Sequence, residues 1–92
     1  MTSSSQFISE FKGRALGNII LAEGAIRFFH DALLDQECKT IVVELLDKAI
    51  SECSWAGKNE ASSLCHKARS LILNNKFSLA NELLEKVEIE LR

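Results

Sequence analysis

Apolar residues recur along most of the chain at alternating intervals of three and four positions. This spacing places them on one face of an α-helix, so the pattern predicts an all-α protein. The longest stripe extends from residue 8 to residue 33 and consists of Ile8, Phe11, Ala15, Ile19, Ala22, Ile26, Phe29 and Leu33. Three shorter stripes follow it, and the chain therefore predicts four helices.

Each shorter stripe defines the inward face of one predicted helix. The second helix ends near Ser54 and turns Cys38, Val42, Leu45, Ala49 and Cys53 inward. The third carries Ala61, Leu64, Cys65, Ala68, Leu71 and Ile72. The fourth carries Phe77, Ala80, Leu84, Val87 and Leu91. The short connections predict antiparallel neighbours, hence a four-helix bundle-like arrangement of two helical hairpins, over about residues 15–54 and 59–91.

Residues suited to helix ends mark the connections. Gly57 suits a left-handed cap, Asn59 suits an N-cap, and Asn74-Asn75 tolerates positive φ. Residues 1–5 are expected to form a flexible tail, which leaves residues 6–92 as one domain. Gly13, Gly17 and Gly24 have two interpretations: a break that separates a short extra N-terminal helix, or a flat strip for close helix contact.

The chain contains an imperfect internal sequence repeat about as long as one helical hairpin. Periods of this length are typical of stacked helical units. Ala25, His30 and Ala32 recur 36 residues later as Ala61, His66 and Ala68, and the segment 44–52 recurs 38 residues later as 82–90. We therefore interpret the two hairpins as related packing units. The positions Ala68, Leu71, Phe77, Ala80, Leu84 and Val87 resemble a tetratricopeptide-type hairpin. That resemblance implies two units that close on each other or pair with another chain, and it implies no ligand site.

Charge and composition restrict the function classes. The net charge is −2, which argues against a general nucleic-acid binder. An odd number of cysteines, three, and the absence of a signal peptide or bilayer span predict a cytoplasmic protein away from membranes. Residues 57–76 carry four basic side chains and one acidic side chain between two acidic segments. Electrostatic fit within the bundle or between subunits explains this pattern best.

Candidate chemical groups are sparse. His30, Cys38, Cys53, Cys65 and His66 lack the spacing of two to five residues that is usual in zinc sites, so no metal or cofactor is predicted. The carboxylate pairs Glu82/Glu85 and Glu88/Glu90 are expected on the solvated face of the last helix, and no enzymatic activity is predicted.

We therefore expect a non-enzymatic intracellular protein–protein interaction module, acting as adaptor, regulator or inhibitor. A second apolar stripe, Leu21, Ala25, Phe28 and Ala32, makes the first long helix apolar on two faces and predicts a homodimer. The expected interface anchors are Leu21, Phe28 and Trp55. One alternative is a DNA-binding regulator that uses Lys67 and Arg69 of the basic third helix. A second alternative is a metal or thiol redox sensor.

Overall fold

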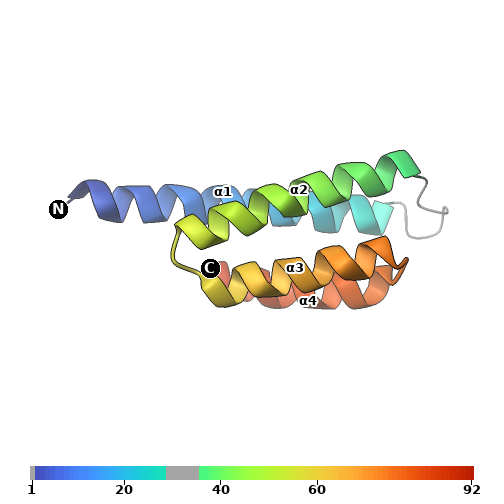
Figure 1. The fold of residues 1–92 in the computed structure, drawn as a ribbon. Coiled ribbons are helices and arrows are strands. Elements are labelled where there is room, and N and C mark those ends of the chain that lie inside the picture. Colours follow the sequence, from blue (N-terminus) through green and yellow to red (C-terminus); the bar gives the residue numbers. More distant parts are fainter. Residues whose placement is uncertain (1, 29–35) are drawn as a thin grey trace.

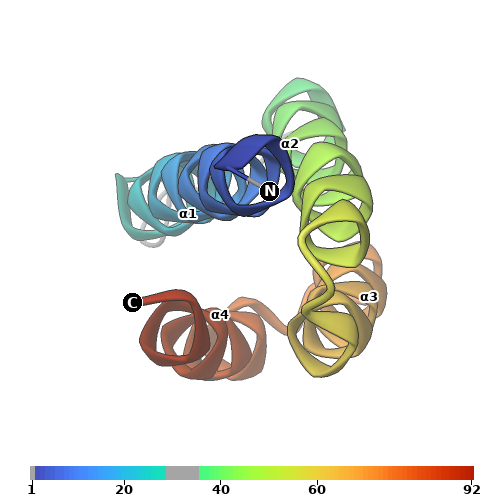
Figure 2. The same cartoon turned by 90° about the vertical axis from the view of Figure 1, so that its left-hand side faces the viewer.

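The computed structural model describes residues 2–28 and 36–92, which form four α-helices and no strand. Helix α1 spans Thr2–Phe28, α2 spans Gln36–Trp55, α3 spans Asn59–Leu73 and α4 spans Phe77–Leu91. Neighbouring helices run antiparallel, and α1 also packs against α4, so the four helices occupy the corners of a closed bundle (Figures 1 and 2). The predicted all-α bundle of two antiparallel hairpins is confirmed.

Every helix buries four apolar residues at the same intervals of four, three and four positions. All sixteen side chains are at most 1% exposed. They are Ala15, Ile19, Ala22 and Ile26 in α1; Val42, Leu46, Ala49 and Cys53 in α2; Ala61, Cys65, Ala68 and Ile72 in α3; and Ala80, Leu84, Val87 and Leu91 in α4. This spacing keeps one seam of each helix toward the bundle axis, as in left-handed antiparallel bundles.

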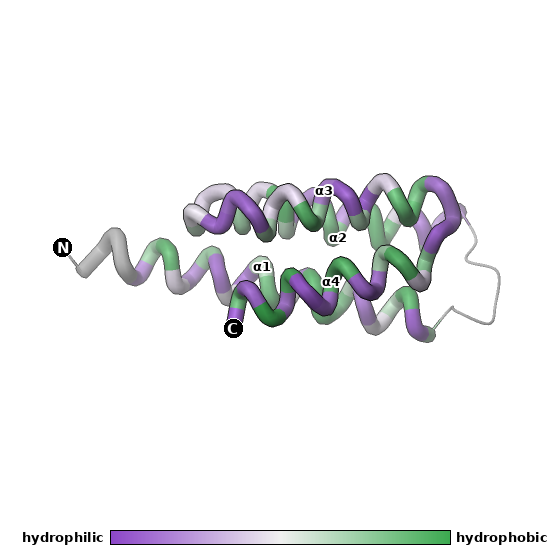
Figure 3. The backbone as a smooth tube through the Cα atoms, turned by 90° about the horizontal axis from the view of Figure 1, so that it is seen from below, coloured by the Kyte–Doolittle hydropathy of each residue, from purple (hydrophilic) through white to green (hydrophobic). Residues whose placement is uncertain are grey.

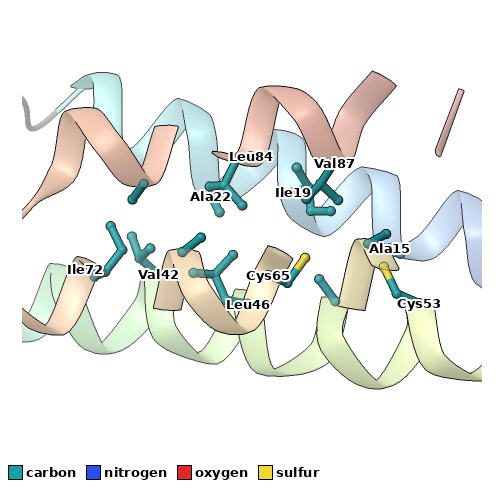
Figure 4. Close-up of a cluster of buried hydrophobic side chains, with 14 of the residues drawn as sticks. Ala15, Ile19, Ala22, Val42, Leu46, Cys53, Cys65, Ile72, Leu84 and Val87 are labelled. Atoms are coloured by element: carbon teal, nitrogen blue, oxygen red, sulfur yellow. The ribbon is translucent and has the colours of Figure 1, made fainter. Parts of the chain in front are cut away.

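In antiparallel register these sixteen residues stack as four layers, each with one residue from every helix (Figure 4). In the order α1 to α4, the layers are Ala15, Cys53, Ala61 and Leu91; Ile19, Ala49, Cys65 and Val87; Ala22, Leu46, Ala68 and Leu84; and Ile26, Val42, Ile72 and Ala80. Every layer contains at least one alanine beside larger side chains. Mixing small and large residues lets the layers fill at close helix separation.

The α2–α3 connection is closed by Gly57 in the left-handed region, with φ 76°. The Gly57 amide donates to the Ser54 carbonyl at 3.0 Å, and the Lys58 amide donates to the Cys53 carbonyl at 2.8 Å. These two bonds form a Schellman cap, as expected for Gly57. The prediction of Asn59 as the N-cap is wrong by one residue: Lys58 holds that position. It provides no side-chain cap, because the lysine ammonium has no acceptor for the first amides of the helix.

The α3–α4 connection repeats this geometry with asparagine in place of glycine. Asn75 has φ 61°, which asparagine tolerates better than most residues. Its amide donates to the Ile72 carbonyl at 3.0 Å, and the Lys76 amide donates to the Leu71 carbonyl at 2.8 Å. The predicted helix end at Asn74-Asn75 is thus confirmed.

Helix α1 runs without a break through Gly13 and Gly17, so the predicted alternative of a hinge there is wrong. The helix has packing partners along its inner face, and this packing outweighs the weak helix propensity of glycine. Helical structure begins at Thr2, within the segment expected to be a tail. Of the predicted apolar stripes, Phe29, Ala32 and Leu33 lie outside the described residues, as does His30.

The positions of the buried residues in each helix test whether the sequence repeat is also a structural repeat. The buried sets of α2 and α4 are offset by 38 residues, as the repeat predicts, and those of α2, α3 and α4 follow one another at 19 residues. The offset of 36 residues is wrong for α1, whose buried set precedes that of α3 by 46 residues. Ala25 is only half-buried, whereas its predicted equivalent Ala61 is fully buried.

One inward position of α2 was also assigned incorrectly. Leu46 is fully buried and Leu45 is half-buried, the reverse of the prediction, and Cys38 is half-buried. The two adjacent leucines allow two phases of the apolar stripe, and the contacts with α1 and α3 select the one that contains Leu46.

The N-terminal turns of α1 project beyond the ends of α3 and α4 (Figures 1 and 3). Phe7 is 50% exposed and Ile8 is 44% exposed in this projecting part. The inner stripe of α1 therefore continues past the bundle that covers it.

Truncating a core leucine tests the layer arrangement. Leu84→Ala removes a fully buried side chain, and we expect the free energy of unfolding in urea to fall by about 2–5 kcal/mol. The matched control is Leu79→Ala on the same helix, where the leucine is 49% exposed and the expected loss is about 1 kcal/mol or less. Equal losses at the two positions would contradict the layer assignment.

Candidate interaction surface

The outer face of α1 carries large apolar side chains that the bundle does not cover. Ile20 is 44% exposed, Leu21 is 62% exposed and Phe28 is 78% exposed. The inner face of the same helix supplies one residue to each core layer. Helix α1 is therefore apolar on two opposite sides, and its inner side is the one that contributes to the core.

Three glycines share this outer face with the large apolar residues. A Cβ atom added at Gly13, Gly17 or Gly24 would meet nothing within 4 Å, and all three residues are exposed. Each glycine costs about 1 kcal/mol in a helix interior relative to alanine. No contact in the described structure requires a missing side chain at these positions. We call Gly13, Gly17, Ile20, Leu21, Gly24 and Phe28 together the outer face of α1.

An aromatic cluster occupies the end of the bundle from which α1 projects. Trp55, the last residue of α2, is 57% exposed and meets Phe11 edge-on at 5.1 Å between ring centroids. Phe7 packs against Phe11 at 4.5 Å, and the Arg14 guanidinium lies 5.2 Å from the centre of the Phe11 ring. The predicted anchor Trp55 is thus accessible and sits at the α1–α2 junction.

The two residues predicted as DNA contacts, Lys67 and Arg69, lie in different environments. The Arg69 side chain donates from Nε to Oδ1 of Asp47 at 2.7 Å, an ion pair that joins α3 to α2. Lys67 is exposed. The ion pair supports the expectation that the basic third helix fits its acidic neighbour, and it engages one of the two cations that a nucleic-acid site would need.

Two of the three cysteines belong to the core, and none of the three forms a disulfide. Cys53 and Cys65 are fully buried, in adjacent layers (Figure 4). Donating its proton to the Cys53 sulfur raises the pKa of the Cys65 thiol, and burial raises it further. Both sulfurs are shielded from solvent, whereas reactive cysteines are at least partly exposed, which weighs against a redox sensor that uses this pair.

One buried charge was missed by sequence reasoning. Glu23 of α1 is only 2% exposed, and its Oε2 accepts a hydrogen bond from Arg27 at 3.2 Å. Its Oε1 has no hydrogen-bond partner among the described residues. Burial and the charge of Glu88 in α4 raise the pKa of Glu23. The Glu88 side chain is only 27% exposed, so its predicted place on the solvated face is wrong. The one available signal was the position of Glu23 within the apolar stretch 19–26.

The described residues contain no group of three or more metal-ligating side chains that could hold an ion. A surface hollow of about 310 Å³ beside Trp55 is lined by α2 alone, through Asp47, Lys48, Ser51 and Glu52. One helix provides no converging polar groups of the kind that orient a small ligand. None of the described helices has the length and apolar character needed to cross a membrane.

No family model, no curated protein and no solved structure matches the chain. The surface properties of the bundle are therefore the basis for a functional proposal.

Alanine substitution distinguishes the outer-face glycines from the turn glycine. Gly17→Ala should increase the free energy of unfolding by about 1 kcal/mol, since the new methyl group meets open space in a helix. Gly57→Ala is the matched control and should lower it by about 1–2 kcal/mol, because φ there is +76°. Urea unfolding at high dilution measures both. A loss of stability in Gly17→Ala would show that the helix around this residue is not regular.

Proposed function

We propose that the protein is a non-enzymatic protein–protein interaction module that self-associates through the outer face of α1. The observation that carries this proposal is the second apolar side of α1, on which Ile20 is 44% exposed and Leu21 is 62% exposed. Contiguous apolar surface of this kind is typical of protein interfaces. Leucine and phenylalanine each contribute about 1.5–3 kcal/mol when they are buried from water.

The glycines favour close contact with another helix over nonspecific association through apolar side chains. Gly13, Gly17 and Gly24 leave the backbone accessible, so another helix can approach α1 more closely than side chains would allow. Such an approach would offset the cost of about 1 kcal/mol that each glycine imposes on the isolated helix. The outer face therefore suits a helical partner.

A second copy of the chain is the simplest such partner. Two α1 helices crossing antiparallel about a two-fold axis near residues 18 and 19 would set Gly17 of each copy against Ile20 of the other, and Gly13 against Gly24. Ile20 would then face a glycine, and the Gly13–Gly24 pairs would let the two backbones approach closely. One helix face buries less area than the roughly 1,600 Å² of a standard interface, so we expect association at micromolar concentrations.

Sedimentation equilibrium tests the proposal directly. The wild-type chain should sediment at twice its monomer mass of 10.3 kDa at micromolar concentration. Leu21→Glu should return it to the monomer mass, because burying an unpaired carboxylate opposes association. The helical circular dichroism of the variant should match that of the wild type, since Leu21 lies outside the core.

The matched control is Ile89→Glu, which places the same charge at a residue of α4 that is 75% exposed. This variant should sediment like the wild type. A wild-type chain that remains at 10.3 kDa, or a control as disruptive as Leu21→Glu, would overturn self-association through α1.

A further inference from the structure

Two charged side chains flank the glycines of α1 at equal distances along the helix. Glu10 lies three residues before Gly13, and Arg27 lies three residues after Gly24. At 100° per residue, Glu10 falls on the line of the glycines, and Arg27 falls on the flank of the same face beside Ile20. Both side chains are exposed, at 57% and 64%. Opposite charges therefore lie at the two ends of the outer face of α1.

Each of these side chains has one ionic partner on its own helix. The Arg14 guanidinium donates to Oε1 of Glu10, and Arg27 donates from Nη2 to Oε2 of Glu23 at 3.2 Å. A carboxylate has a second oxygen, and a guanidinium has several further N–H donors. Glu10 and Arg27 can therefore each bind a further group of opposite charge without losing the partner they have.

An antiparallel pair of α1 helices brings the two residues together. The two-fold axis that sets Gly13 against Gly24 of the other copy also sets Glu10 against Arg27 of the other copy, because each charged residue lies three positions outside its glycine. The two charges meet about 13 Å along each helix from the crossing point. Helices that cross at about 20° stay close enough over this length for two long side chains to reach each other. The two-fold axis repeats the pair on the other side of the crossing.

A parallel pair of α1 helices would have the opposite effect. It would set Glu10 against Glu10 of the other copy and Arg27 against Arg27, and facing like charges oppose association. The outer face is thus complementary in charge to itself only in the antiparallel orientation. A second copy of this chain is therefore the partner that the face fits.

We propose that Glu10 of each copy pairs with Arg27 of the other, and that these two ion pairs fix the antiparallel orientation of the α1 contact. This inference rests on the proposed self-association through the outer face of α1.

The partners on the same helix extend each ion pair into a network. On each side of the crossing, Arg14 and Glu10 of one copy would adjoin Arg27 and Glu23 of the other, so that positive and negative charges alternate. A single exposed ion pair contributes little to association, whereas a network of several charges has a larger effect. Reversing one charge in it therefore gives a measurable change in affinity.

Sedimentation equilibrium of charge-reversed variants tests the proposal in the full chain. Glu10→Arg should raise the dissociation constant of the dimer about tenfold, because two attractive pairs become repulsive. A parallel dimer would be unaffected, since two facing glutamates would become two facing arginines. An equimolar mixture of Glu10→Arg and Arg27→Glu should contain more dimer than either variant alone, because every facing pair in the mixed dimer has opposite charges.

Glu82→Arg, at an exposed glutamate of α4, is the matched control. It changes the net charge by the same amount as Glu10→Arg and should leave the dissociation constant unchanged.

Cysteine cross-linking determines the orientation with both charges in place. A Cβ atom at Gly13 or Gly24 meets nothing within 4 Å, so cysteine fits at either position. Oxidation of a mixture of Gly13→Cys and Gly24→Cys should join position 13 of one copy to position 24 of the other, identified by the mass of the linked peptides. Neither variant alone should form a cross-link between two copies of its new cysteine.

A wild-type dimer whose dissociation constant is unchanged in Glu10→Arg, or one that cross-links position 13 to position 13, would overturn the ion pairs and leave self-association in place. A wild-type chain that stays monomeric would overturn both. If Arg27→Glu does not fold because Glu23 loses its partner, Glu10→Arg and the cross-links decide the proposal.

Discussion

The core layers are the constraint on which the structure depends. Each helix must present four residues at intervals of four, three and four, and each layer must combine large and small side chains within one narrow cross-section. Where Leu46 and Leu84 enter a layer, Ala22 and Ala68 complete it. Enlarging one of these alanines would force helices apart, whereas shrinking a leucine would leave a cavity. The antiparallel register of all four helices follows from satisfying every layer at once.

Helix α1 contributes to this core and also has apolar surface outside it. Its inner face supplies Ala15, Ile19, Ala22 and Ile26 to the layers, and its flank contributes Glu23 to the contact with α4. Its outer face lies opposite the core and leaves Ile20 and Leu21 exposed. Core packing and surface exposure are thus separated on one helix, so changes at Ile20 or Leu21 would leave the layers intact.

Sequence periodicity predicted the four helices, both turns and most core positions, because local spacing determines which residues share a helix face. It failed where a neighbouring helix decides the outcome. The choice between Leu45 and Leu46 depends on contacts with α1 and α3, and the burial of Glu23 depends on the packing of α1 in the folded bundle. Leu21, Phe28 and Trp55 were identified as apolar residues in excess of one core. Their exposure required the three-dimensional arrangement.

The two chain ends lie at the same end of the bundle, on α1 and α4 (Figure 1). These helices meet without a connecting loop, whereas the chain itself links α1 to α2, α2 to α3 and α3 to α4. Tension applied between the termini would therefore act across the α1–α4 contact first. It would peel the two helices apart from that end and separate their layers one after another. Such a geometry yields at lower force than shearing, in which all the layers would bear the load at once.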